Sequence, residues 1–524
     1  MAAGVEKTGD RTVSGPGLDA LGSLTCGPRI DDLLARAAKT APEHIALRSP
    51  DAAVTYGELD RRVTSFAAAL CEPGVDAGET VALAVGLDLA FAVAYLGISR
   101  AGRVSAIVNP LLPDDRLAGS LARSGATTVV VTPPVYRRLA ALRSGFPAVR
   151  RIVLTHRDAE LDAEGASLST MDELIAAGFR LPEVTVGEVA ALQFTSGTTG
   201  PPKTVRLTHR NLTVNAAQTA YGNRLSGTSV LFNFLPTFHP MHLTTGIAAG
   251  ATHVLFPGKD PVEAVRFAAE AGATHFYSLP IRLSQLAGDP RLPGLKVPTL
   301  RAILCGGSAL PPAAAETLSA RFGVPAMQGY GLAETSPSVT LGDPDLPKPG
   351  SSGVPVPGTE CRVVHVDTGS VLGPGEKGEI QVRGPQLMKG YLGGPDLAPG
   401  DWFATGDIGR FDDEGHLFVV DRIKDVFKCD NWLVAPTEIE RVLKSHPAVT
   451  DCVVFDRPDD LHGAVACGIA VLAEPVEEDE LLRFVNVQVA EYERLHELRP
   501  VSEIPRSPNG KIPRRALRDR FLAS

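Results

Sequence analysis

The feature that most constrains the fold is the alternation of short apolar runs with helical stretches between residues 80 and 154. The runs are rich in Val, Ala and Ile and predict strands, whereas the stretches between them predict helices. The predicted strands are Val81–Val85, Val104–Val108, Thr127–Val131 and Arg151–Leu154, and the predicted helices are Leu89–Arg100, Arg116–Ser124 and Val135–Ser144. This alternation predicts an α/β fold with parallel-rich sheets covered by helices. Ligands usually bind at the loops that follow such strands.

One stretch, Val81–Ser99, is apolar enough to raise the question of a membrane span. Gly86 and Asp88 interrupt it, and a strand followed by a helix explains the same residues. We therefore predict two ordinary elements of a globular domain here, with a membrane span as the weaker alternative.

Length and composition limit the classes of protein that fit. A chain of 524 residues is too long for one ordinary core, so at least two domains are expected. The net charge of −9 disfavours nonspecific attachment to nucleic acid or anionic membrane, although a local basic patch could still hold a polyanionic ligand. The seven cysteines include no Cys-x-x-Cys pair, so neither a disulfide framework nor a zinc site is predicted. Without a secretory signal, we expect a loose leader over residues 1–26 and a cytoplasmic location.

The predicted strand Val189–Phe194 runs into a loop whose composition suits phosphate. Glycine lets the backbone turn its N–H groups inward, while four hydroxyls and Lys203 add donors and one positive charge. A Walker loop is excluded because that motif needs adjacent Gly and Lys, and two prolines intervene here. The loop residues predicted to bind phosphate are Thr195, Ser196, Gly197, Thr198, Thr199 and Gly200. The alternative is an ordinary surface turn.

Two further glycine-dense turns, Leu304–Leu310 and Gly329–Thr335, each follow an apolar stretch. Because glycine has no side chain, two glycine-rich backbone segments can form a slot for a flat ring, and Tyr330 offers a face on which such a ring can stack. Glu334 lies in the second turn, and a carboxylate next to phosphates needs a cation between them. The pattern indicates a planar ligand with phosphates and Mg²⁺, the alternative for Glu334 being a surface glutamate.

These motifs resemble those of the adenylate-forming superfamily, which includes acyl-CoA ligases, the adenylation domains of peptide synthetases and the luciferases. Thr195–Lys203 resembles its phosphate loop, and matching segments recur in order from about residue 30 to the C-terminus. Those segments are Thr55–Asp60, Leu304–Leu310, Gly329–Thr335, Gly378–Gly384, Ala404–Arg410 and Asp421–Asp425. The resemblance implies a stand-alone acyl-CoA ligase with ATP, Mg²⁺ and CoA as ligands. Such an enzyme activates a carboxylic acid as acyl-AMP and then transfers the acyl group to CoA with release of AMP.

The resemblance also implies roles for individual residues in nucleotide binding. Adenine would lie in the glycine turns, against Gly306, Gly307, Ser308, Gly329, Tyr330 and Gly331. Thr198 and Glu334 would coordinate Mg²⁺, and Thr335 would contact the α-phosphate. Asp407 is expected to accept hydrogen bonds from both ribose hydroxyls, because an ionised carboxylate has two acceptor oxygens. Arg422 would lie near the ribose.

Two domains are implied by the same resemblance. A large N-terminal domain would cover residues 27–421, and a small α+β C-terminal domain would cover residues 422–524. The hinge would lie at Asp421–Asp425, with Lys424 as its pivot.

Lys511 matches the adenylation lysine of the superfamily. The preceding Pro-Asn-Gly sequence predicts a tight turn that would present this lysine to the reacting carboxylate and α-phosphate. Rotation about the hinge would then remove Lys511 and bring another face of the small domain, with Lys428 and Asn431, to the thiol. Lys203, His239, Lys428 and Lys511 are therefore the candidate catalytic residues.

Leu235–Leu243 resembles the segment in which an aromatic or histidine residue borders the carboxylate pocket, and that residue is His239 here. A half-buried loop histidine is the alternative interpretation. Peptide-synthetase domains that select amino acids place an Asp near this point to hold the ammonium group. No Asp lies between Leu235 and Leu243, so the resemblance favours a simple carboxylic acid.

The chain departs from the family pattern at Thr204 and Asn431, where the family usually has glycine. A side chain in place of glycine, where the backbone approaches a ligand closely, is expected to crowd that ligand and so to impair one of the two half-reactions. The alternatives to a complete ligase are an enzyme that retains one half-reaction, supplying a carrier protein or using preformed acyl-AMP, and a non-catalytic nucleotide-binding protein. Free CoA is the expected acceptor, because no carrier domain follows Ser524 and Thr335–Thr405 leaves little room for the insertion of ligases that stop at fatty acyl-adenylate.

Overall fold

The computed structural model describes residues 6–7, 12–24, 27–71, 79–158, 161, 167–195, 203–236, 239–430, 432–506 and 512–523. The chain forms two compact units. The large unit comprises residues 1–8, 13–360 and 383–403, and the small unit comprises residues 9–12, 361–382 and 404–524. The small unit thus includes two segments that the sequence assigned to the N-terminal domain, because these pack with the C-terminal residues. The hinge at Asp421–Asp425 stays a prediction.

The first sheet of the large unit has eight strands in the order β21-β11-β10-β6-β5-β7-β8-β9. These strands are β5 Thr80–Ala84, β6 Val104–Ile107, β7 Thr128–Val131, β8 Arg151–Leu154, β9 Ser167–Thr170, β10 Val189–Phe194, β11 Thr204–Thr208 and β21 Gly390–Tyr391. The pairs from β10 to β9 are parallel, whereas β11 and β21 join antiparallel. The predicted parallel sheet is confirmed, with strand bounds that differ from the predicted ones by at most one residue at either end.

The second sheet has nine strands in the order β18-β17-β16-β15-β14-β12-β13-β3-β4. These strands are β3 Ile45–Arg48, β4 Ala53–Thr55, β12 Val230–Phe234, β13 Thr252–Leu255, β14 His275–Ser278, β15 Ala302–Cys305, β16 Ala326–Gly331, β17 Ser338–Leu341 and β18 Val354–Pro355. The pairs from β16 to β3 are parallel. The loops after β12, β15 and β16 therefore leave the same edge of this sheet, which is where ligands bind in such folds.

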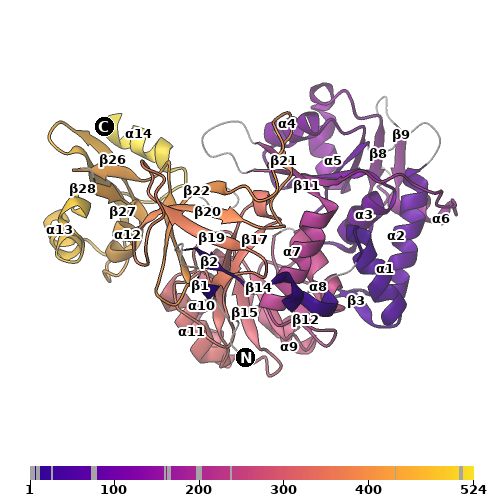
Figure 1. Cartoon of the computed structure of the whole chain (residues 1–524), viewed down its shortest axis with the longest axis horizontal. Helices are drawn as coiled ribbons and strands as arrows, with labels where there is room; N and C mark the ends of the chain where they lie inside the picture. Colours follow the sequence, from indigo (N-terminus) through magenta and orange to yellow (C-terminus); the bar gives the residue numbers. More distant parts are fainter. Residues whose placement is uncertain are drawn as a thin grey trace. The chain divides into compact units, whose positions relative to one another are not determined.

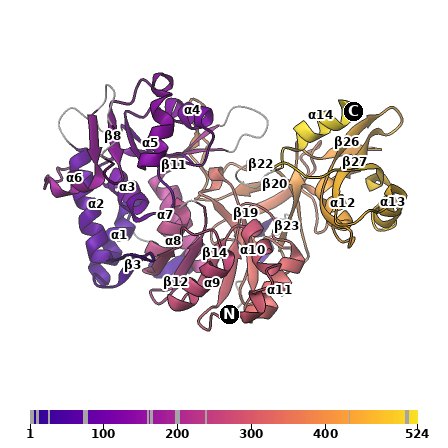
Figure 2. The same ribbon diagram turned by 180° about the vertical axis from the view of Figure 1, so that it is seen from behind.

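Helices pack on both sheets. Those of the large unit are α1 Ile30–Thr40, α2 Tyr56–Leu70, α3 Leu89–Arg100, α4 Asp114–Ser124, α5 Pro133–Ala140, α6 Met171–Ala176, α7 His209–Gly222, α8 Pro240–Ala249, α9 Pro261–Glu270, α10 Pro280–Ala287 and α11 Pro312–Phe322. Figure 2 shows α9, α10 and α11 side by side, and their Val265, Leu286 and Leu318 share one buried cluster with Phe232 and Phe276 of the second sheet. Burial of these apolar side chains is the main force that holds helices to sheet.

The first three long helices lie together at one end of the large unit (Figure 1). Helix α2 begins at Tyr56 because the Thr55 hydroxyl accepts the backbone N–H of Glu58, as is typical of an N-cap. Gly97 of α3 lies against the ring of Phe66 of α2, and a Cβ there would collide with that ring. The close approach of the two helices therefore depends on this glycine.

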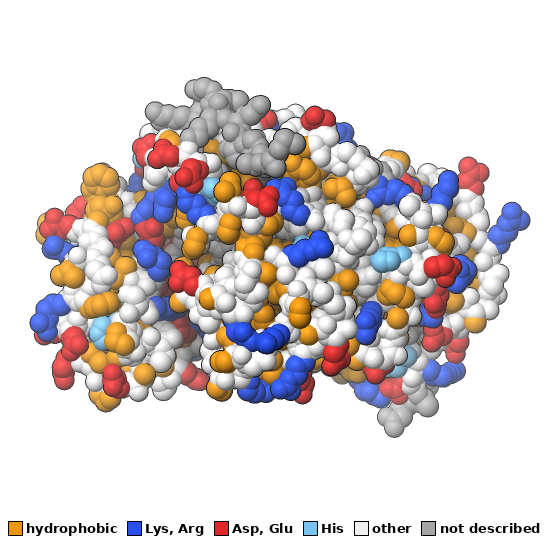
Figure 3. Space-filling model, turned by 90° about the horizontal axis from the view of Figure 1, so that it is seen from below, with side chains coloured by type: hydrophobic (Ala, Val, Ile, Leu, Met, Phe, Trp, Pro, Cys, Tyr) orange, Lys and Arg blue, Asp and Glu red, His pale blue; other side chains and the backbone are white. Residues whose placement is uncertain are grey.

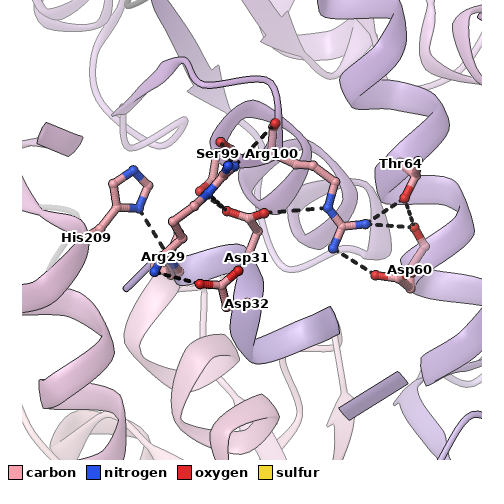
Figure 4. Close-up of polar contacts among 9 residues, drawn as sticks. Arg29, Asp31, Asp32, Asp60, Thr64, Ser99, Arg100 and His209 are labelled. Atoms are coloured by element: carbon pink, nitrogen blue, oxygen red, sulfur yellow. Dashed lines mark hydrogen bonds and ion pairs between the residues drawn. The ribbon is translucent and has the colours of Figure 1, made fainter. Parts of the chain in front are cut away.

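A buried ion-pair network ties these helices to one another (Figure 4). Asp31 Oδ1 of α1 lies 3.0 Å from Arg29 Nε and accepts a 2.9 Å hydrogen bond from Ser99 Oγ, while Oδ2 lies 3.6 Å from Arg100 Nε. Arg100 in turn lies 2.8 Å from Asp60 of α2. Asp31 and Arg100 are 5% and 8% exposed, so each charge depends on its partners for the solvation that water would supply.

The small unit contains β23 Leu417–Arg422 and, apart from one end residue of each, β19 Glu360–Val364, β20 Gly378–Arg383 and β22 Phe403–Phe411; these strands are neighbours in one sheet. Further along the chain are the hairpin of β24 Phe427–Cys429 and β25 Trp432–Val434, and a three-stranded sheet of β26 Val449–Asp459, β27 Gly463–Leu472 and β28 Leu495–Pro500. Helices α12 Pro436–Leu443, α13 Glu478–Asn486 and α14 Arg514–Ala523 contribute to a separate hydrophobic core around Val453, Val465 and Phe521.

The structure also bears on the predictions made for a membrane span, for surface charge and for the cysteines. None of the helices in the described residues is long and apolar enough to cross a membrane, and Val81–Ser99 falls in β5, a short loop and α3. On the face drawn in Figure 3, Lys and Arg side chains are interspersed with Asp and Glu rather than gathered in one basic surface. The six cysteines in the described ranges are all free thiols.

Candidate active site

The ends of the predicted phosphate loop are held together by hydrogen bonds. The backbone N–H of Thr195 donates to the Lys203 carbonyl at 2.9 Å, and the Lys203 N–H donates to Thr195 Oγ1 at 3.0 Å. The intervening loop, with Ser196, Gly197, Thr198, Thr199 and Gly200, lies outside the described residues. The adjoining strands β10 and β11 pair antiparallel, so the loop connects two rigid neighbours.

Thr204, the first departure from the family pattern, is the first residue of β11. Thr204 is 8% exposed and pairs with Phe194 of β10. Its carbonyl accepts the Leu392 N–H at 2.8 Å. Thr204 is not among the residues with positive φ. A β-branched residue suits such a strand position, so its backbone needs no glycine here.

Lys203 and Glu334 both contact Tyr391. Lys203 Nζ lies 4.6 Å from the centroid of the Tyr391 ring, and the Tyr391 hydroxyl donates a 2.8 Å hydrogen bond to Glu334 Oε1. Burial raises the pKa of Tyr391 well above its ordinary value, and the Glu334 carboxylate raises it further. The hydroxyl therefore stays protonated and remains a donor. Sequence reasoning missed Tyr391, whose Gly-Tyr context carries no chemistry by itself.

Glu334 has the properties of a ligand for a hard divalent cation. It lies in the 3₁₀ turn η4 Ala333–Thr335, is 8% exposed, and its carbonyl accepts the Met388 N–H at 2.8 Å. Only Oε1 is used by Tyr391, and Oε2 has no hydrogen-bond partner among the described residues. Mg²⁺ is commonly held by one or two carboxylates plus phosphate oxygens, so this carboxylate fits it. Thr198, the other predicted ligand, lies outside the described residues.

The two glycine turns lie next to each other. Gly306, Gly307 and Ser308 follow β15, and Gly329 lies on the adjacent parallel strand β16. A Cβ placed on Gly306 would lie 3.7 Å from the carbonyl oxygen of Gly329, so the two backbones are in contact distance at this edge of the sheet. Use of these turns by adenine stays a prediction.

The glycines of the second turn also have a packing role that sequence reasoning did not see. A Cβ on Gly331 would collide with the Pro337 carbonyl, and one on Gly329 would collide with the Leu341 side chain. Both partners lie on or next to β17, which pairs antiparallel with β16. These glycines are therefore required by the sheet itself, whatever ligand the turn binds. Tyr330, between them, is partly exposed.

Thr335 is fully buried, and its hydroxyl is used inside the turn. It accepts the Leu332 N–H at 3.0 Å and donates to the Leu332 carbonyl at 3.1 Å and to the Pro337 carbonyl. These bonds shape the turn that presents Glu334. The contact of Thr335 with the α-phosphate stays a prediction, and this geometry supports a structural role.

His239 lies in the loop after β12 and caps the N-terminus of α8. Its Nδ1 accepts the Met241 N–H at 3.2 Å, and burial lowers its pKa to about 4. Burial also lowers the pKa of His242 to about 3, with smaller contributions from His239 and His253. The His242 ring packs edge-on against Tyr277, with centroids 4.8 Å apart. At neutral pH both histidines are uncharged, so this segment presents aromatic surface and no charge from them.

The small unit carries the remaining predicted residues. Asp407 on β22 is 4% exposed and faces Arg422 on β23, with Arg422 Nε 3.1 Å from Asp407 Oδ1. Lys424 follows β23 and is exposed. Lys428 on β24 lies 2.6 Å from Asp367, and both side chains are about half exposed. Asn431 and Lys511 lie outside the described residues.

Two parallel-rich sheets, with two glycine turns next to each other at one sheet edge and a buried carboxylate at Glu334, form the architecture expected of an enzyme that binds a nucleotide. The chain belongs to the AMP-binding, adenylate-forming enzyme family: the profile of the AMP-binding enzymes matches residues 34–392, and that of their C-terminal domain matches residues 438–511. The resemblance found in the sequence is thereby confirmed.

Named relatives narrow the class. The chain is 34% identical to "4-coumarate--CoA ligase 5" of Oryza sativa subsp. japonica, over 90% of either chain. It is 32% identical to "Feruloyl-CoA synthase" of an Amycolatopsis species, over 93% of this chain and 98% of the relative. This protein is an AMP-forming acid–thiol ligase of the acyl-CoA synthetase kind, which forms an acyl-adenylate with ATP and then a CoA thioester.

Solved structures agree with the fold. ATP-bound MatB from Rhodopseudomonas palustris superposes with a TM-score of 0.81 at 25% identity, covering 94% of this chain and 99% of that one. o-Succinylbenzoate CoA synthetase from Bacillus subtilis, with its acyl-adenylate bound, superposes with a TM-score of 0.80 at 26% identity, covering 93% and 98%. These structures include an ATP complex and an acyl-adenylate complex of the same fold.

Proposed function

We propose that this enzyme activates an aromatic acid of the hydroxycinnamic kind and transfers it to CoA. The structural observation that carries the proposal is the pairing of His242 with Tyr277 beside His239, in the segment expected to border the carboxylate pocket. Two neutral imidazoles and a phenol provide an aromatic, uncharged wall that suits a planar aromatic acid. Relatives named for 4-coumarate and for a feruloyl product, both hydroxycinnamic acids, support the same substrate class.

The chemistry requires two displacement steps. A carboxylate oxygen attacks the α-phosphorus of ATP and pyrophosphate leaves, and then the CoA sulfur attacks the acyl carbon and AMP leaves. The first step brings negative charges together, so positive groups must offset them. Lys203 and Lys511 would supply that charge. Mg²⁺, held by Glu334 and Thr198, would neutralise phosphate charge.

The second step would use the other face of the small domain after rotation about Lys424. Lys428 would then be near the thiol path. Its ion pair with Asp367 joins two half-exposed groups, and such pairs contribute little to stability. Asp367 precedes Lys424 in the chain and Lys428 follows it, so rotation at Lys424 would separate the two groups at little cost, which is compatible with a mobile role.

Comparison of matched acids tests the substrate class. 4-Coumarate, ferulate, cinnamate, benzoate, malonate and octanoate would be assayed separately for pyrophosphate release and for acyl-CoA formation. We expect kcat/KM for the hydroxycinnamates to exceed that for malonate and octanoate by at least about a hundredfold, because a neutral aromatic wall discriminates against the second carboxylate of malonate and the flexible chain of octanoate. L-Tyrosine is the matched control, since it shares the phenol ring of 4-coumarate but adds an ammonium group. Preference for malonate, octanoate or L-tyrosine would contradict the proposal.

A further inference from the structure

The backbone around Tyr391 holds this residue next to the phosphate-loop lysine. Strand β21 pairs antiparallel with β11, which begins directly after Lys203, and Tyr391 is the register partner of Val205. Gly390 has a φ of 143°, and a Cβ there would collide with the Pro395 carbonyl. Only glycine suits that position. The backbone conformation of Gly390 therefore fixes the orientation of the residue that follows it, Tyr391.

Tyr391 contacts two groups of opposite charge. Its ring faces the Lys203 ammonium at 4.6 Å, and its hydroxyl donates to Glu334 at 2.8 Å. Both contacts are favourable, because the ring face attracts the Lys203 ammonium and the hydroxyl proton attracts the Glu334 carboxylate. One side chain thus satisfies a lysine and a carboxylate that lie on different elements.

Lys203 and Glu334 carry opposite charges and contact the same side chain, so they attract each other. No ion pair joins Lys203 and Glu334 in the part of the chain that the structure describes. Direct pairing would occupy the lysine that is needed by phosphate and the carboxylate that is needed by a cation. Instead each group contacts Tyr391, and Glu334 Oε2 has no hydrogen-bond partner among the described residues.

We propose that Tyr391 is a positioning residue that keeps Lys203 and Glu334 from pairing with each other and holds both ready for the triphosphate and its divalent cation. The inference rests on the roles of Lys203 and Glu334 in the proposed function. It assigns Tyr391 no contact with the reacting atoms.

Two substitutions separate the contributions of the ring and the hydroxyl. Tyr391→Phe keeps the ring below Lys203 and removes the bond to Glu334, whereas Tyr391→Leu removes both. Calorimetry would measure ATP affinity with EDTA and with saturating Mg²⁺, a readout that does not depend on turnover. We expect Tyr391→Phe to retain the ATP affinity measured with EDTA. The increase in ATP affinity on adding Mg²⁺ should be about tenfold smaller than in the wild type, because Glu334 is no longer oriented.

Tyr391→Leu should also weaken metal-free ATP binding, by about tenfold, because Lys203 becomes free to pair with Glu334. Adding Glu334→Gln to Tyr391→Leu should then restore metal-free affinity, while Glu334→Gln alone should change it little. A structural role for Tyr391 would not produce this rescue. Equal metal-free affinity in the Leu variant and the wild type, or the absence of rescue, would overturn the inference.

Tyr95→Phe is the matched control, since the Tyr95 hydroxyl is buried without a hydrogen-bond partner among the described residues. It should leave both affinities unchanged. If Tyr391→Leu does not fold, Tyr391→Phe decides alone, and an unchanged gain from Mg²⁺ overturns the inference. Wild-type enzyme that binds ATP but releases no pyrophosphate with any acid would refute the proposed function instead, so the two failures are distinguishable.

Discussion

Asp407 and Arg422 face each other across the β22–β23 hairpin, with Arg422 Nε 3.1 Å from Asp407 Oδ1. Asp407 is nearly buried, whereas the Arg422 side chain is 45% exposed. The guanidinium is therefore one of the groups that orient this buried carboxylate. The sequence predicts that both residues lie near the ribose, and in the structure they form an ion pair.

We expect Asp407→Ala to weaken ATP and acyl-AMP binding alike, by about 2 kcal/mol, since the ribose is common to both ligands and hydrogen bonds to a charged group are lost. Calorimetry with both ligands measures this. Asp367→Ala, which removes an exposed acid of the same unit, is the control and should leave both affinities unchanged. Equal ATP affinity in Asp407→Ala and the wild type would show that Asp407 does not bind the ribose.

Lys511→Ala should lower acyl-adenylate formation by at least about a hundredfold, because transition-state charge is left unopposed. Transfer from supplied acyl-AMP to CoA should be much less affected. Pyrophosphate release and acyl-CoA formation from purified acyl-AMP are the two measurements. A similar loss in both would argue against domain alternation.

His253 is fully buried, and burial lowers its pKa to about 4. In the unfolded chain the pKa is near 6.5, so the unfolded state binds more protons between these values and stability falls as pH falls through that window. At pH 5 the loss is about 2 kcal/mol for this one histidine. His253→Gln should therefore show a smaller drop in melting temperature between pH 7 and pH 5 than the wild type. Parallel profiles would contradict the burial of a neutral His253.

Asp31→Ala should destabilise the protein by about 3 kcal/mol, because it removes one of the two carboxylates beside the buried Arg100 charge and leaves Asp60 alone to offset it. The melting temperature would measure the loss. Glu58→Ala is the control, since it breaks the exposed pair of Glu58 with Arg62 on α2 and should cost well under about 1 kcal/mol. A similar loss of stability in the two variants would mean that the ion pairs in Figure 4 contribute no more to stability than an exposed ion pair does.

The two departures from the family pattern now have different expectations. Thr204 has an ordinary strand backbone, so Thr204→Gly should destabilise β11 by about 1 kcal/mol and should not speed pyrophosphate release. If Asn431 crowds the thiol path, Asn431→Gly should speed transfer from acyl-AMP to CoA and leave pyrophosphate release unchanged. Faster pyrophosphate release in Thr204→Gly would show that this side chain disturbs the phosphate loop.

The sequence by itself determined the class of fold and the family. Alternation of strands and helices is a local pattern, so β8, β10 and α3 have the predicted bounds. α5 was wrong by four residues at its end: it stops at Ala140, and a separate 3₁₀ turn, Arg143–Gly145, follows. Motifs with fixed spacing, such as the phosphate loop and the glycine turns, carried the family resemblance because their chemistry depends on neighbouring residues.

Only the tertiary structure decided which distant residues meet. Tyr391 lies 57 positions beyond Glu334, and the two meet because β21 joins the sheet edge at β11 and the adjoining backbone binds η4. The packing role of Gly331 and the hydrogen bonds of the Thr335 hydroxyl likewise depend on Pro337 and β17. Contacts of this kind arise from strand pairing and burial across the whole unit, and no local pattern encodes them.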